Sequence, residues 1–470
     1  MWRRLAIYFE KNPKMSKLIR WIEPSTYFLA FAWLLAMFVY ASYYVIPLPD
    51  PNTIVYARLE QVVFGFGFNR LSLISTPVIL LWGLGTLLLL FCGYRFQRTI
   101  NHFITVYWGF LVEKKWLLAV LCVLAWIPFF LLRSNMISAD MRIYMQWLPD
   151  QAGRNIVHVR FDEMWESNLH SSFYILANRL WGWSVPQSFQ FVATLAGPVF
   201  LYLLVIFCQK ILPVKAPFLF LLLISGGYMQ LFFGDMEYYT LSLTLLLGYF
   251  LAALAYIRKD VPLEVPALIL GIAMTFHMET AFLLPTLFYL SIFAFQRRTW
   301  SSLVFAWITL ALTISLTLLF FTHNGADLIN LRDTSWGLGR GGNMLANIII
   351  PTVATLAARL NMLTVIYPLI WFLPLLIFFK RVALNELNGF LLIGAACGIP
   401  FSLVWISTIG FYSDWNLFSM PMFPAVILTG ISFLDQRRLA YRKYLYILLI
   451  SFSILVSYAW IINNHLRGNL

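Results

Sequence analysis

Thirteen apolar stretches divide this 470-residue chain, and most are about as long as a membrane-crossing helix. An α-helix needs roughly 20 apolar residues to cross the hydrocarbon core. Only helices and closed barrels can satisfy every backbone hydrogen bond there. The stretches predict spans near residues 27–46, 71–94, 116–132, 189–209, 216–233, 238–257, 263–276, 279–295, 300–321, 363–379, 387–409, 419–434 and 444–462. We therefore expect an all-α polytopic integral membrane protein with about 13 transmembrane helices.

Composition excludes the main soluble classes. The chain is 61% hydrophobic and 11% charged, whereas a soluble domain is about half apolar and about a quarter charged. Cys92, Cys122, Cys208 and Cys397 lie in or beside apolar stretches, so we interpret them as core residues and not as a disulfide framework or a metal site. The excess of basic residues lies in short loops, where topology and anionic lipid explain it. We expect contact with membrane lipids and no nucleic-acid partner.

Charge distribution predicts the orientation of the chain. With the N-terminus in the cytoplasm, the cytoplasmic ends and loops hold 22 Lys and Arg but only 7 Asp and Glu, while the opposite side holds 11 and 13. Basic residues favour the cytoplasmic side. Residues 1–23 then form a basic segment on the lipid surface. We expect a multi-pass protein of a bacterial inner or plasma membrane, with its active site on the non-cytoplasmic side.

The predicted organisation has four parts. Residues 1–132 hold the basic segment and three spans, and 133–187 form a long external loop with helical stretches around 139–149 and 169–181. Residues 188–435 form the transmembrane core, including a second external loop at 322–343, and 436–470 hold the last span and the C-terminus. Residues 263–295 predict either two short helices meeting at His277 or one broken helix. Residues 344–362 predict a partial span or an interfacial helix.

Acidic residues gather on the predicted external face, where a cluster of carboxylates is a functional-site candidate. The set is Asp140, Asp235, Glu237, Glu279, Asp327, Asp333 and Asp414. Asp140 opens a predicted helix, where backbone N–H groups can keep a carboxylate ionised. Such a carboxylate could take a proton from an attacking hydroxyl; the alternative is a simple helix N-cap. Asp235 and Glu237 could bind acceptor hydroxyls or an amine, or share a divalent cation; the alternative is two ordinary loop acids.

Cationic side chains on the same face are candidates for binding phosphate. They are Arg142, His170, His277, Arg332 and Arg340. Arginine offers bidentate hydrogen bonds to phosphate, and the alternative for each is a solvated or lipid-headgroup contact. His277 stands beside Glu279 in an otherwise apolar stretch, where polar groups are costly; the alternative is a structural His277–Glu279 hydrogen bond. The Gly337–Gly342 run could present backbone N–H groups to a phosphate or form a flexible loop.

Several motifs, taken in order, resemble the GT-C superfamily of polytopic glycosyltransferases. Asp140-Met-Arg-Ile-Tyr144, then His170-Ser-Ser-Phe-Tyr-Ile-Leu176 and Leu180-Trp-Gly182, resemble the first external loop of its aminoarabinose-transferase and protein-mannosyltransferase branches. Met141 stands where those branches have Glu, and Ser171 and Ser172 stand where they have prolines. Gly234–Tyr239, Gly271–Pro285 and Tyr412–Pro424 are similar to later motifs of the family. The resemblance covers residues 133–435 and leaves out the first two spans.

The resemblance implies an inverting enzyme that moves a sugar from a polyprenyl-phosphate donor to a lipid, glycan or protein acceptor. Asp140 would be the base, and the donor phosphate would be held by His277 with external cations from Arg142, His170, Arg332 and Arg340. Asp235, Glu237, Glu279 and Asp414 would form the acceptor side. A divalent cation, Mg²⁺ or Mn²⁺, could take part. The alternatives are a polymerase or ligase of polyprenyl-linked glycans, which shares the donor chemistry, and a transporter or flippase of lipids or glycans.

Overall fold

The computed structural model describes residues 84, 97–137, 139–154, 157, 159–324, 353–378, 381–405, 415–434 and 443–466. The spans expected at 27–46 and, apart from Leu84, at 71–94 lie outside these residues, as do Arg332, Arg340, Asp414 and the Gly337–Gly342 run. In the described part of the chain, all the regular secondary structure is helical apart from a single bridge residue at Trp405. This is as expected for an all-α protein. The protein is a helical membrane protein.

Five of the described helices are long and apolar enough to cross a membrane. They are α9 (Val185–Ile211), α11 (Thr240–Ile257), the continuous unit η6–α13 (Met278–Gln296), α14 (Trp300–His323) and α17 (Glu386–Val404). A sixth is the pair formed by α4 (Gln97–Glu113) with α5 (Lys115–Leu124) and α6 (Trp126–Leu131), which bends by 106° at Lys114. The five single helices correspond to expected spans, and so does the α5–α6 half of the bent pair, whereas no span was expected at α4; the count of 13 stays a prediction.

Other expected spans form shorter or interrupted helices in the described part of the chain. These are α10 (Ala216–Ile224) with η5 (Gly227–Phe232), α12 (Glu264–Phe276), α15 (Val353–Ile366) with η10 (Pro368–Trp371) and α16 (Phe372–Phe378), α18 (Ser419–Leu434) and α19 (Lys443–Leu466, whose apolar part is Leu449–Ile462). The chain packs closely against α15 just after the end of α10. A Cβ at Gly227 would lie 1.9 Å from the carbonyl oxygen of Val365, so only glycine allows this close backbone approach. α15 covers part of the uncertain stretch 344–362.

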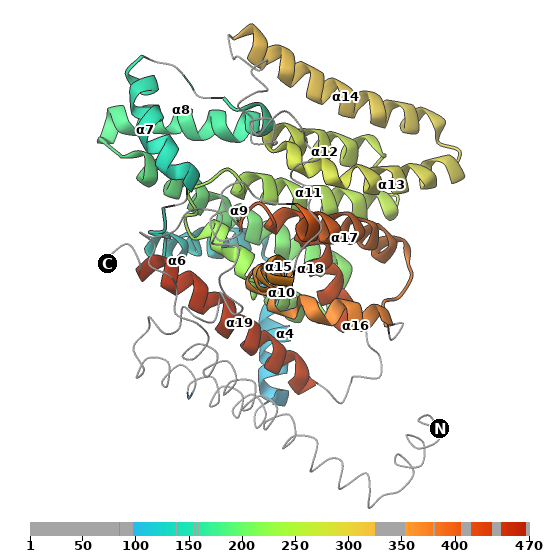
Figure 1. Ribbon diagram of the computed structural model, residues 1–470. Helices are drawn as coiled ribbons and strands as arrows, with labels where there is room; N and C mark the ends of the chain where they lie inside the picture. Colours follow the sequence, from blue (N-terminus) through green and yellow to red (C-terminus); the bar gives the residue numbers. More distant parts are fainter. Residues whose placement is uncertain are drawn as a thin grey trace, which may run out of the picture.

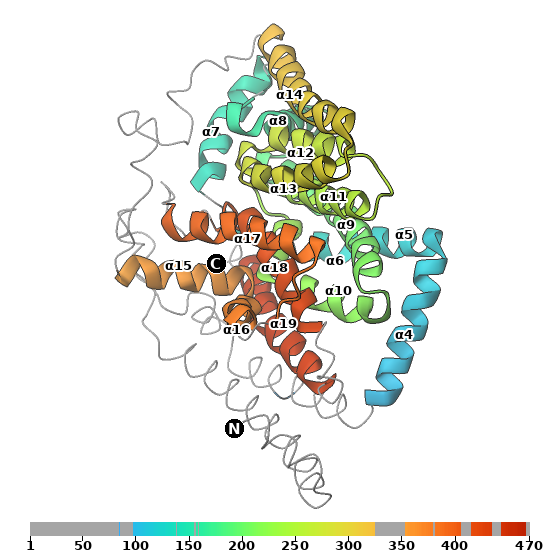
Figure 2. The same cartoon turned by 90° about the vertical axis from the view of Figure 1, so that its right-hand side faces the viewer.

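The helices pack in layers that place α12 between α11 and α14 (Figure 1). α17 packs along α18, and both contact α11 on the side away from α12 (Figure 2). α19 packs against α10. The outer face of α14 is apolar and exposed at every fourth residue, with Trp300, Val304, Ile308, Leu312 and Leu316. A face of this kind is stable against lipid and would be unstable in water.

Two helices of the expected external loop lie at one end of this bundle. α7 (Ala139–Gly153) packs against α9, and α8 (Met164–Trp181) packs against both α9 and α12 (Figure 1). They cover the two helical stretches expected in this loop. α8 ends at Gly182, whose φ of 67° is left-handed, and α9 begins at a capping box in which Ser184 and Gln187 bond reciprocally. These caps fix the turn between α8 and α9.

Candidate functional site

His277 lies in the break between α12 and η6. α12 ends at Phe276, and His277 adopts an extended conformation with φ −147° and ψ 115°. Its Nδ1 accepts a 3.3 Å hydrogen bond from the backbone N–H of Glu279, and its Nε2 lies 3.4 Å from Oε1 of Glu163. An Nδ1 that accepts carries no proton, so the ring carries its N–H on Nε2, the nitrogen that lies near Glu163. The Tyr239 ring stacks on the imidazole, with centroids 4.8 Å apart.

Glu163 belongs to a buried charged cluster at the start of α8. It lies in the short helix η3 (Phe161–Glu163), and both it and Asp162 are 4% exposed. Arg160 Nε lies 3.4 Å from Glu163 Oε2 and 3.5 Å from Asp162 Oδ1, and its Nη1 donates to the Tyr144 hydroxyl at 2.6 Å. Burial raises the pKa of Glu163, while the charge of Arg160 opposes the rise. The cluster thus joins α7, η3 and the break at His277.

Glu166 caps the N-terminus of α11 from a different helix. Its Oε1 accepts from the backbone N–H of Leu241 at 3.0 Å, and its Oε2 accepts from the backbone N–H and the hydroxyl of Ser242. The α11 N-cap residue, Tyr239, makes no side-chain cap, so Glu166 satisfies N–H groups that have no partner within α11. Complete burial nonetheless raises the pKa of Glu166 to about 7, while the hydrogen bonds from Ser242 and Leu241 oppose the rise.

A second acidic pair lies in the short connection between η5 and α11. The side-chain N–H₂ of Asn416 donates to Asp235 Oδ2 at 3.0 Å and to Glu237 Oε2 at 2.6 Å. All three side chains are buried, and burial raises the pKa of Asp235 to about 7. Gly234, at φ 68°, starts this turn, and a Cβ there would lie 2.8 Å from Cβ of Arg133. One amide therefore holds two carboxylates together.

The beginning of α7 lies against the same acidic connection. Asp140 is the second residue of α7. Met141, which follows it, is fully buried in a cluster that includes Tyr144, Phe189, Met236 and Tyr238. Met236 and Tyr238 flank Glu237 in sequence. The fold therefore brings the first turn of α7 to the Asp235–Glu237 connection, although the two segments are far apart in the chain.

The remaining predicted residues have different surroundings. Arg142 is exposed on α7, and Glu279 is half-buried in η6 beside His277. His170 is fully buried, and its Nδ1–H donates to the Glu166 carbonyl at 2.9 Å. Burial lowers the pKa of His170 to about 4, so the ring is neutral at pH 7. Glu279 contributes its backbone N–H to His277, and the carboxylate that faces the imidazole is that of Glu163.

Sequence reasoning missed five residues of this region: Arg160, Asp162, Glu163, Glu166 and Asn416. The run Phe161-Asp-Glu-Met-Trp-Glu166 contains a signal for three of them, because acids alternate there with large apolar residues. When large apolar residues next to an acid are buried, the acid is buried with them, and a buried carboxylate needs a hydrogen-bond or ion-pair partner. Nothing local marks Asn416, whose role depends on contacts with residues far away in the sequence.

The described residues contain no group of three or more His, Cys, Asp or Glu side chains placed to hold a metal ion. Asp235 and Glu237 converge on an amide nitrogen of Asn416, and this arrangement supplies two carboxylates only. Mg²⁺ is usually held by one or two carboxylates together with substrate phosphates and waters, so this pair is the part of the described chain that could contribute to such a site. The geometry suits hydrogen bonding and proton exchange between buried acids.

No family model, curated protein or solved structure matches the chain.

Proposed function

We propose that this protein is a membrane glycosyltransferase that moves a sugar from a polyprenyl-phosphate donor to an acceptor at the non-cytoplasmic face. The observation that carries the proposal is the collection of carboxylates beneath α7 and α8, next to helices whose outer faces are apolar. A lipid-linked donor needs both features. Its tail requires apolar helix surfaces, and an acceptor hydroxyl requires a carboxylate. The order of motifs that resembles the GT-C superfamily supports the same activity.

Asp140 is the proposed base, because it lies in the first turn of α7, where the helix dipole favours an ionised carboxylate. Asp235 and Glu237 lie on the connection against which that turn packs, and they are the proposed acceptor side together with Glu279 and Asp414. Stabilisation of charge on the departing phosphate is expected to be the largest catalytic effect. Arg142, Arg332 and Arg340 are the proposed external cations for it.

We propose a specific role for His277 that depends on its contact with Glu163. Its single N–H faces Glu163, so it can donate to a donor phosphate only by turning away from that carboxylate. Arg160 would then remain as the partner of Glu163, at 3.4 Å. We propose that donor binding exchanges the His277–Glu163 contact for a His277–phosphate contact. His170, which is fully buried and neutral, serves the packing of α8 in this scheme.

The test is a transfer assay with purified protein in lipid nanodiscs. A panel of polyprenyl-phosphate sugars is offered with lipid, glycan and peptide acceptors, each with and without Mg²⁺ or Mn²⁺, and the released polyprenyl phosphate is measured. Asp140→Asn serves as the inactive control, and Asp150→Asn as the matched one, because Asp150 is an exposed residue of the same helix paired with Arg154 at 3.0 Å. Release that requires acceptor and Asp140 supports the proposal. If the protein turns over none of the donors in the panel, the result argues against the proposal. A polymerase or ligase would release polyprenyl pyrophosphate only when a polyprenyl-pyrophosphate glycan is offered as the donor.

One observation favours a second function, a proton-coupled transporter. Glu163, Glu166 and Asp235 are buried carboxylates with raised pKa values, and they lie near a helix break at His277. Transporters use discontinuous helices and buried acids to couple protons to a substrate. Proteoliposomes loaded with a pH-sensitive dye distinguish the two functions. Substrate-dependent proton movement without sugar transfer would favour the transporter.

A further inference from the structure

α4 changes direction sharply where it meets the next helix. Its axis bends by 106° at Lys114 before Lys115–Leu131, the unit that α5 and α6 form. Figure 2 shows α4 standing across α5. The α5–α6 unit is as long as the shortest helices that cross a membrane, about 17 residues. It can therefore cross the membrane alone, and α4 is not needed to complete this span.

The α5–α6 unit runs antiparallel to α9. In α6, Trp126 Nε1 donates to Thr194 Oγ1 at 3.1 Å, and in α5, Leu118 shares a buried cluster with Val205. The contacts therefore follow α9 for about three turns. Because α4 makes a large angle with the α5–α6 unit, it lies across α9. α9 is long and apolar enough to cross a membrane, so α4 lies close to the plane of that membrane.

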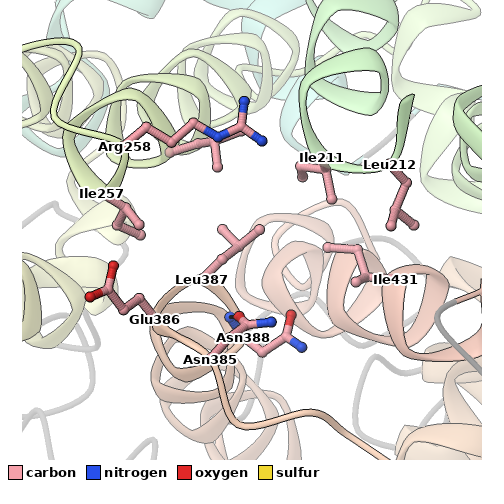
Figure 3. Close-up of a pocket in the computed structure, with 10 residues that line it drawn as sticks. Ile211, Leu212, Ile257, Arg258, Asn385, Glu386, Leu387, Asn388 and Ile431 are labelled. Carbon is pink, nitrogen blue, oxygen red and sulfur yellow. Dashed lines mark hydrogen bonds between the residues drawn. The ribbon is translucent and has the colours of Figure 1, made fainter. Parts of the chain in front are cut away.

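α4 contacts α9 close to the end of that helix, where the bundle meets water. Trp108 Nε1 donates to Gln209 Oε1 at 2.9 Å, and α9 ends at Ile211. Figure 3 shows exposed charges at this end of the bundle, with Arg258 after the end of α11 and Glu386 at the beginning of α17. Three helices that can cross a membrane thus have a terminus here, and charged groups at such termini mark the boundary between membrane and water.

The surface of α4 divides into three faces, which follow from the helical repeat of 3.6 residues. One face is partly buried, and its Trp108 and Val112 pack in a cluster with residues of α9 and α10. The second face is apolar and 48–56% exposed, and its residues are Phe103, Val106, Tyr107 and Phe110. The third face is exposed and polar or small, and its residues are His102, Thr105, Gly109 and Glu113. The apolar and polar faces are centred about 100° apart around the helix.

This arrangement fits a helix that lies on the surface of a bilayer. A spanning helix at the edge of the bundle would have lipid around both of its outer faces, whereas α4 has one apolar and one polar outer face. An apolar stripe of this size is unfavourable in water. We propose that α4 is an interfacial helix. Its apolar face is buried in lipid at the boundary between headgroups and acyl chains, and its polar face remains in water.

Lipid, and not a partner protein, covers the apolar face, because the membrane-crossing unit that follows α4 also has an exposed apolar face. Val120, Val123 and Ile127 are 45–63% exposed and are spaced three and four residues apart, as on one side of a helix. Lys114 and Lys115 are exposed at the bend between the two helices, where their charges can contact lipid phosphates. The proposal does not depend on sugar transfer.

The accessibility of spin labels in the full chain tests this. The four native cysteines are replaced with alanine, single cysteines are introduced and labelled with a nitroxide, and spectra are recorded in liposomes of phosphatidylethanolamine and phosphatidylglycerol. Oxygen concentrates in lipid, whereas a nickel chelate stays in water. Labels at Val106→Cys and Phe110→Cys should collide mainly with oxygen, at a depth of about 5–10 Å. Labels at the matched controls Thr105→Cys and Gly109→Cys should collide mainly with nickel.

Three results would overturn the proposal. Nickel access at Val106 and Phe110 equal to that at Thr105 would place the apolar face in water. Oxygen access at all four positions would make α4 part of a span. Access by neither reagent at Val106 and Phe110 would show that protein covers this face.

A second measurement needs no replacement of cysteines. Amide hydrogen exchange in lipid nanodiscs is compared between Val106→Asp and Thr105→Asp, two exposed positions where the fold tolerates substitution. Val106→Asp should raise the exchange rate of α4 amides about tenfold, because a charge placed against lipid favours release of the helix. Thr105→Asp should leave the rate near that of wild type, and equal rates in the two variants would contradict the proposal.

Discussion

His277 Nε2 lies 3.4 Å from Glu163 Oε1, and this contact joins the break between α12 and η6 to the start of α8. Both side chains are buried. The contact therefore ties the start of α8 to the helices α12 and α13 that flank the break.

A double-mutant cycle should detect this contact. We expect His277→Ala to destabilise the protein by about 1–3 kcal/mol, because it leaves a buried carboxylate with one partner fewer. Glu163→Gln should cost less, since its amide oxygen can still accept from Nε2–H. The coupling energy between the two substitutions should exceed about 0.5 kcal/mol. Thermal unfolding in detergent measures it, and purely additive effects would show that the contact carries no energy.

The cap that Glu166 supplies to α11 should be important for stability. Glu166→Ala removes every hydrogen bond to Leu241 and Ser242, and we expect a loss of about 1–3 kcal/mol. Glu166→Gln keeps one acceptor oxygen and should lie between wild type and Ala. Amide hydrogen exchange provides the specific readout, because protection should fall first at the N-terminus of α11. Unchanged protection there would contradict the capping role.

Stability should fall as pH rises from about 4.5 through 7. In the folded state, the pKa of Glu166 and of Asp235 is about 7, against 4.5 and 3.8 for free groups. The folded chain therefore holds protons that the unfolded chain has lost, so the contribution of these two acids to stability is greatest at low pH and is lost as pH rises through 7. His170 acts in the opposite direction, but only between about 4 and its ordinary 6.5. Melting temperatures from pH 6.5 to 8 should decline in wild type, and this decline should be smaller in Glu166→Gln and in Asp235→Asn. Exposed Asp150→Asn should match wild type, and a flat wild-type profile would show that these acids are ionised.

Close packing of α17 on α18 depends on glycine. A Cβ at Gly398 would lie 1.8 Å from the carbonyl oxygen of Pro421, so Gly398→Ala must push the two helices apart. We expect a loss of at least about 2 kcal/mol or failure to fold. Gly109→Ala, in α4, is the matched control, because a Cβ there meets nothing within 4 Å and alanine favours a helix. A mild effect of Gly398→Ala would mean that the helices are less tightly packed than their backbones indicate.

The sequence predicted the helices better than it predicted their contacts. Apolar runs located α9, α11, α14 and α17 to within a few residues, and the polar pair in an apolar stretch located the break at His277. Hydropathy did not reveal where expected spans are interrupted, and it could not reveal that Gly227 packs against the carbonyl of Val365, which is distant in the sequence. The partner of His277 was also missed for this reason. Glu279 is adjacent in sequence, whereas Glu163 is brought to the imidazole by the fold.

The measurement that tests the proposed function most directly is the turnover of Asp140→Asn with a polyprenyl-phosphate sugar that wild type transfers. We predict that turnover falls by about 10²–10⁴, while donor affinity and melting temperature stay close to wild type. Asp150→Asn, an exposed acid of the same helix, should keep full turnover. Wild-type turnover in Asp140→Asn would contradict the proposal that Asp140 is the base of a sugar-transfer reaction.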